Sequence, residues 1–133
     1  MDLSSLKASQ EAQVLELLHP ANGTVIKDSE FGVFTISLLS SDTNNYKSEY
    51  EKLMKAARES KGTISARHSE EKACVMLAKI TTGCNIILDK KVDKKPLKFS
   101  TTAMKDLYFN PEYTWLREQV EAFIRDRGNF IKS

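Results

Sequence analysis

The chain is poor in the residues that cross-link or interrupt small proteins, with two cysteines, three prolines and five glycines among 133 residues. Cys74 and Cys84 stand ten positions apart and form no CxxC pair, so the sequence offers neither a disulfide framework nor the ligand spacing of a zinc site. His19 and His68 do not complete such a spacing. We therefore expect no metal, no cofactor and two free, buried thiols in a reducing compartment, the cytoplasm.

Long apolar runs are absent as well. No stretch approaches the roughly 18 consecutive apolar residues of a membrane span, and the first residues, MDLSSLKASQEAQ, lack a basic start followed by an apolar segment. We expect a soluble protein without a secretory signal and without a membrane partner.

Neither sign of charge dominates, because 20 lysines and arginines face 18 acidic residues and leave a net charge of +2. This balance differs from the basic excess of a nucleic-acid-binding domain. One local basic cluster lies between residues 90 and 98, where Asp89 precedes the lysines, Asp93 interrupts them and no aromatic residue is interleaved. Its lysines are Lys90, Lys91, Lys94, Lys95 and Lys98. A solvated loop is the favoured interpretation, and a nucleic-acid site is the alternative.

Signatures of catalysis are also missing. The sequence contains no GxxxxGK[ST], GxGxxG, GxSxG or HExxH motif. Adjacent carboxylates such as Glu70 and Glu71 point in different directions on a helix and do not form a paired acid and base. We expect that the protein is not an enzyme and has no catalytic residues.

The length and the hydrophobic fraction of 41% fit one domain covering residues 1–133. Residues 13–39 form its β-rich part. Residues 13–27 predict a hairpin-like pair around the turn cluster of Pro20, Asn22 and Gly23. A strand then starts at Gly32, and its alternating apolar residues are Phe34, Ile36 and Leu38.

From residue 42 to residue 130 the period of the apolar residues becomes helical. The first helix is expected over 42–62, with Ser41 or Asp42 as its N-cap, and its stripe is Tyr46, Tyr50, Leu53, Met54 and Ala57. The second is expected over 69–83, with Glu70 and Glu71 in its first turn, and its stripe is Ala73, Met76, Leu77 and Ile80, continued by Cys84. We assign the fold class α+β, mainly α: a small N-terminal antiparallel β element, a hairpin or three strands, followed by three to four packed helices.

Two further helices are predicted near the C-terminal end of the sequence. Ser100 to Thr102 can cap a short helix, and Asn110 with Pro111 starts a last helix that Gly128 ends. We expect the stripe of the last helix, Leu116, Val120, Phe123 and Ile124, to pack on the helix around Met76, Leu77 and Ile80.

Aromatic residues gather around Pro111. Such a cluster either locks a joint between helices, the favoured interpretation, or anchors a partner. Two more apolar residues follow the expected helix end at Gly128, and we expect them to remain available to a partner. The candidate partner-binding residues are Tyr108, Tyr113, Trp115, Phe130 and Ile131.

Three segments together resemble the tail assembly chaperones of long-tailed bacteriophages (siphoviruses) and their prophages. The segments are LLHPANGTVI with FTISLLSSDTNNY, EKACVMLAKITTGCNI, and PLKFSTTAMKDLYFNPEYTWLREQVEAFIRDRGNF. The third matches the family's extended "pl.f" piece, its short helix ending in tyrosine and its final "W.reqv..fi.d..nF" helix. Residues in those places include Pro96, Leu97, Phe99, Leu107, Tyr108, Trp115, Arg117, Val120, Phe123, Ile124, Asp126, Asn129 and Phe130.

The resemblance implies a viral protein that is encoded between the tail tube and tape measure genes. Such a protein binds the tape measure protein, keeps it soluble and helps to recruit tail tube subunits. It would act in the host bacterial cytoplasm during phage tail assembly and be absent from the mature virion, with self-association as a further expectation. The alternative is a structural tail or head-completion protein that is retained in the virion.

Overall fold

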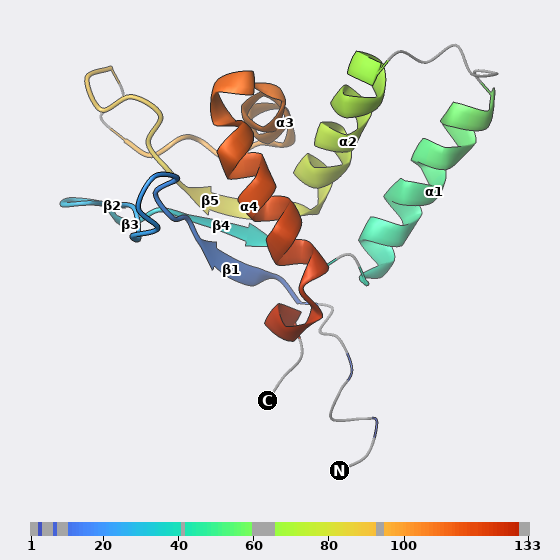
Figure 1. Cartoon of the computed structure of the whole chain (residues 1–133), viewed down its shortest axis with the longest axis horizontal. Coiled ribbons are helices and arrows are strands. Elements are labelled where there is room, and N and C mark those ends of the chain that lie inside the picture. Colours follow the sequence, from blue (N-terminus) through green and yellow to red (C-terminus); the bar gives the residue numbers. More distant parts are fainter. Residues whose placement is uncertain are drawn as a thin grey trace.

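The computed structural model describes residues 3, 7, 11–40, 42–59, 66–92 and 95–130. Within these ranges the chain has the expected α+β architecture, mainly α (Figure 1). The elements in chain order are β1 (Gln13–Glu16), β2 (Lys27–Asp28), β3 (Gly32–Val33), β4 (Thr35–Leu38), α1 (Asn44–Glu59), α2 (Ala66–Ile80), β5 (Thr81–Asn85), α3 (Thr101–Phe109), the 3-10 turn η2 (Pro111–Tyr113), α4 (Thr114–Arg125) and the 3-10 turn η3 (Arg127–Phe130).

The three-stranded sheet has the order β1-β4-β5, and both pairings are antiparallel. The alternation predicted after Gly32 is confirmed, since Ile36 and Leu38 are fully buried and Phe34 packs against the core. The hairpin-like turn is present as well, as a bridge between Leu18 and Val25. The ladder of β1, however, runs along β4, from Gln13 opposite Leu38 to Glu16 opposite Thr35.

Strand β5 overturns one expectation, because it lies inside the part of the chain expected to be helical. Helix α2 ends at Ile80 instead of Gly83, and Cys84 belongs to the strand. At the junction the Thr81 hydroxyl donates to the carbonyl oxygen of Leu77 (2.8 Å). The β-branched pair Thr81–Thr82 followed by a glycine favours an extended backbone, which sequence periodicity could not separate from a fraying helix end.

Helix starts were predicted with mixed success. The Ser100 hydroxyl accepts from the Ala103 amide (3.0 Å), as expected. The Asn110 side chain accepts from the Glu112 amide (3.0 Å), but it caps the 3-10 turn η2, and α4 itself starts at Thr114 without a side-chain cap. Helix α1 begins at Asn44, and the Thr43 hydroxyl, one residue after the expected Asp42, accepts from the Tyr46 amide (3.2 Å), while Ser41 lies outside the described residues.

The core lies between the sheet and helices α2, α3 and α4, and α4 crosses the strands in Figure 1. Leu116, Val120 and Ile124 are buried there, as expected, together with Leu77 and Ile80. The backbone of α2 nevertheless packs mainly along α3, and Met76 is only half-buried on the side that faces α1. The predicted pairing of the α4 stripe with the Met76 face was therefore wrong in that detail.

A side chain of α4 joins the helix to the end of β1. The Gln119 amide oxygen accepts from the Leu18 amide (2.9 Å), and its nitrogen donates to the Leu18 carbonyl oxygen (2.7 Å). Gln119 thus pairs with Leu18 as a neighbouring strand would. This pairing fixes the position of α4 along the sheet.

Shortening a buried side chain of the central strand β4 should destabilise the protein. Ile36→Ala removes a side chain with 0% exposure and is expected to lower the free energy of unfolding by about 2 to 5 kcal/mol. Urea denaturation would measure the loss. The control is Val14→Ala on the neighbouring strand, where the side chain is 59% exposed and a change within about 0.5 kcal/mol is expected. Equal losses in the two variants would contradict the assigned face of the sheet.

Candidate partner-binding surface

The aromatic cluster around Pro111 is built around Tyr108, which is fully buried. Its hydroxyl lies 2.8 Å from the Thr81 hydroxyl. Because Thr81 already donates its single hydrogen to Leu77, Tyr108 must be the donor in this contact. Burial raises the pKa of Tyr108 far above its usual value, so it stays neutral. Tyr108 is a joint between α3 and β5 and cannot contact a partner.

Tyr113 and Trp115 are half-buried and pack against the same core. Beside them a shallow depression of about 530 Å³ is lined by Glu70, Asp106 and Phe109 with Asn110 and Pro111. The favoured interpretation of the cluster, a helix joint, therefore describes Tyr108, while Tyr113 and Trp115 retain some accessible surface.

The expectation for the C-terminal end was wrong for Phe130, which is 1% exposed. Helix α4 ends at Arg125, before Gly128, and the following turn η3 folds Phe130 back onto Phe123. The two rings meet edge to face at 5.4 Å, and the Asn129 amide holds the turn by donating to the Phe123 carbonyl oxygen (3.1 Å). Ile131 lies outside the described residues.

Arg117 joins three helices. Its guanidinium pairs with Glu70 of α2 (2.8 Å) and Glu121 of α4 (3.2 Å) and donates to the Tyr108 carbonyl oxygen of α3 (3.5 Å). The contact of its buried Nε with Glu121 is an ion pair without hydrogen-bond geometry. The Glu70 hydrogen bond raises the pKa of Arg117 further, so the cation persists at every accessible pH.

The acidic pair at the start of α2 has a different role from the one expected. Since α2 begins at Ala66, Glu70 and Glu71 lie beyond its first turn. Glu70 reaches Arg117, and Glu71 pairs with Lys105 of α3 (3.1 Å). These carboxylates therefore hold neighbouring helices and do not complement the end of their own helix.

The thiols occupy different environments. Cys74 is fully buried and accepts a hydrogen bond from Arg117 (3.3 Å), and Cys84 is half-buried. Burial raises the pKa of both thiols, and Arg117 offsets part of the rise at Cys74. Both cysteines are therefore protonated and poorly nucleophilic near neutral pH.

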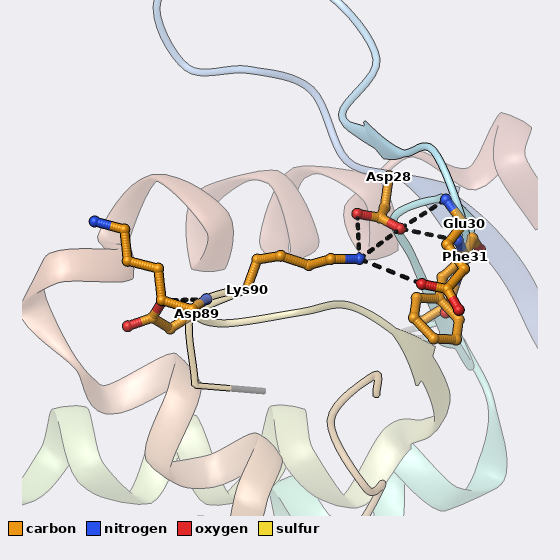
Figure 2. Close-up of polar contacts among 7 residues, drawn as sticks. Asp28, Glu30, Phe31, Asp89 and Lys90 are labelled. Carbon is orange, nitrogen blue, oxygen red and sulfur yellow. Dashed lines mark hydrogen bonds and ion pairs between the residues drawn. The ribbon is translucent and has the colours of Figure 1, made fainter. Parts of the chain in front are cut away.

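The lysine-rich loop is partly tied to the β2–β3 hairpin, as Figure 2 shows. The Lys90 ammonium lies 3.0 and 3.2 Å from the two carboxylate oxygens of Asp28 and 5.2 Å from the centre of the Phe31 ring. Asp28 also accepts from the Glu30 and Phe31 amides (2.8 and 3.0 Å). Lys91, Lys95 and Lys98 are exposed, and Lys94 lies outside the described residues. Lys90 thus has a structural partner, which favours the interpretation of this segment as a loop.

A partly covered apolar surface lies on α1 and α2. Within α1 no described side chain is fully buried: Tyr46 packs on the core, Leu53 and Met54 are half-buried, and Tyr50 is 46% exposed. Tyr46 and Tyr50 stack with ring centres 6.5 Å apart. The predicted stripe is therefore present over these four residues and only partly covered, while the Ala57 side chain is outside the described part of the chain.

A groove runs between these two helices and encloses about 140 Å³. Each helix contributes four residues at positions i, i+3, i+4 and i+7, namely Glu49, Lys52, Leu53 and Ala56 from α1 and Lys72, Val75, Met76 and Lys79 from α2. None of these residues was among the sequence-based candidates. The sequence alone did not single them out, because the charged members of each set, Glu49 and Lys52 in α1 and Lys72 and Lys79 in α2, are typical of ordinary solvated surface.

Comparisons with protein families, with curated proteins and with solved structures find no match to this chain. Among the described residues there is no group of three or more histidine, cysteine, aspartate or glutamate side chains that could hold a metal ion. In the same part of the chain, no helix has both the length and the apolar character needed to cross a membrane.

Removing the Phe130 ring should destabilise the domain. Phe130→Ala is expected to lower the free energy of unfolding by about 3 kcal/mol, because a buried aromatic side chain and its contact with Phe123 are lost. Urea denaturation would measure the change. The control is Leu88→Ala, at a residue that is 41% exposed. An unchanged stability of Phe130→Ala would show that the turn η3 does not dock.

Acid should weaken the clamp between Asp28 and Lys90. Three hydrogen bonds hold the pKa of Asp28 below its usual value of about 3.9. The one from Lys90 has the largest effect, and those from the Glu30 and Phe31 amides come next. The stabilisation is therefore complete above the pKa of the unfolded chain and is lost as the pH falls through the lower folded pKa. In urea unfolding measured at decreasing pH below about 5, Asp28→Asn should lose less stability than the wild type.

Lys90→Ala is the matched variant, because it removes the largest cause of the lowered pKa of Asp28. Its stability should also depend less on pH than that of the wild type. If all three proteins lost stability in parallel, the ion pair would have no part in the acid sensitivity of the fold.

Proposed function

We propose that this chain is a tail assembly chaperone of a long-tailed phage that binds the tape measure protein and keeps it soluble. The observation that carries the proposal is the long C-terminal resemblance, from Pro96 to Phe130, to that family. Several of its motif residues, among them Tyr108, Val120, Ile124 and Phe130, are buried. A motif that specifies packing supports a shared fold, and the fold then supports the function only by analogy.

The surface of α1 and α2 gives physical support. A holding chaperone binds apolar segments reversibly and therefore needs apolar surface that its own core does not cover. Half-buried Leu53, Val75 and Met76 provide such surface beside charged side chains. We propose further that the protein recruits tail tube subunits, acts in the host cytoplasm and is absent from the mature virion, as an interaction protein without catalysis or a nucleic-acid partner.

The alternative is a structural tail or head-completion protein that stays in the particle. The two roles differ in stoichiometry, because a structural protein is present in fixed copy number in purified virions. Mass spectrometry of virions that contain the tail tube and tape measure proteins but lack this chain would favour the chaperone. Its presence at fixed copy number would favour the alternative.

Co-expression tests the proposal directly. The tape measure protein of the same phage should accumulate in the soluble fraction when this chain is co-expressed and should sediment as aggregate without it, because its apolar segments would be covered. The soluble fraction after centrifugation is the measurement. An unrelated aggregation-prone protein serves as the control and should not be rescued. The same soluble yield of tape measure protein with and without the chain would refute the chaperone role.

A further inference from the structure

The floor of the groove between α1 and α2 is apolar and narrow. It consists of Leu53 and Ala56 from α1 and Val75 and Met76 from α2, around a volume of about 140 Å³. A cavity of roughly 150 Å³ is large enough to hold a benzene molecule. The groove therefore has room for one large apolar side chain and not for an extended apolar surface.

The rim of the groove has an excess of positive charge. The Glu49 carboxylate is already paired with Lys79 (2.9 Å) and more loosely with Lys52 (3.5 Å), and the Lys79 hydrogen bond lowers its pKa. Lys72 makes no hydrogen bond or ion pair with any residue that the structure describes, and the Lys52 side chain is 69% exposed. Two lysines on opposite helices are thus available to an incoming anion.

These features define the chemistry of an occupant. In a helix, residues three and four positions apart lie about 5 to 6 Å from one another, so a large apolar residue can have carboxylates on both sides. A nucleic acid offers anions but no aliphatic side chain for the floor, and a neutral apolar segment leaves the lysines unused. An acidic amphipathic helix satisfies both parts of the groove.

We propose that this groove binds an acidic amphipathic helix of a partner protein, with one large apolar side chain between Leu53 and Met76 and carboxylates paired with Lys52 and Lys72. This is a helix-in-groove mode of recognition. The identity of the partner rests on the proposed function, under which the helix belongs to the tape measure protein. The groove itself can be tested without that assumption.

The test uses the full chain and two synthetic peptides of about 18 residues, five helical turns. The acidic peptide carries a leucine stripe flanked by glutamates, and the basic peptide has lysine in place of every glutamate. Fluorescence anisotropy should show that the acidic peptide binds at least about tenfold more tightly, a difference of about 1.4 kcal/mol, and that added salt weakens its binding.

Variants assign the binding to the groove. Lys72→Glu should weaken binding of the acidic peptide about tenfold, whereas Lys95→Glu, which changes an exposed lysine outside the groove, should leave it unchanged. Ala56→Trp should fill the groove and abolish binding without lowering the melting temperature, because Ala56 is exposed. Equal binding of both peptides, no binding of the acidic peptide, or binding that survives Ala56→Trp would overturn the proposal. Self-association of the chain that Ala56→Trp removes would do so too, because a second copy would then be the occupant.

Co-expression separates the groove from the proposed function. If the wild-type chain keeps the tape measure protein soluble and Ala56→Trp does not, the groove and its partner are both supported. If peptide binding needs the groove but Ala56→Trp still keeps the tape measure protein soluble, the assignment of that partner is overturned. If the wild-type chain has no effect on solubility while the acidic peptide binds, the proposed function fails and the groove proposal stands.

Discussion

The fold depends on covering one face of a three-stranded sheet. Ile36 and Leu38 in the central strand are fully buried, and so small a sheet is stable only when helices remove such side chains from water. Helices α2, α3 and α4 do so, and Arg117 holds them together where their ends meet. Helix α1 has little of the sheet left to cover and packs mainly on α2. The partly covered groove follows from this unequal distribution of the helices.

Features that depend on neighbouring residues could be predicted from the sequence, and features that depend on distant contacts could not. The alternation around Ile36 and the caps at Ser100 and Asn110 were predicted because each depends on a few neighbouring residues. Strand β5 was missed because its extended form depends on pairing with β4, far away in the sequence. Phe130 was misjudged for a related reason, since its burial depends on the turn η3, which follows α4 and brings the ring onto Phe123.

The candidate surface was harder to predict than the core. Tyr108 was correctly placed in a cluster, but only the contact with Thr81 identifies it as a joint. The groove residues Lys52 and Lys72 follow the common pattern of solvated helix surface, and only the approach of α1 to α2 brings them to one rim. Sequence periodicity identifies which face of a helix is apolar, but it does not reveal how much of that face its neighbours will cover.

The order of the strands also affects how the chain folds as it is synthesised. β4 leaves the ribosome beside an already completed β1, but its other partner, β5, follows only after the whole of α1 and α2. Until then one edge of the central strand is open to pairing with other chains. The length of the two helices between β4 and β5 therefore sets the shortest interval during which the nascent chain is exposed to misassociation. Fast packing of α1 on α2 would limit any further delay before β5 pairs with β4.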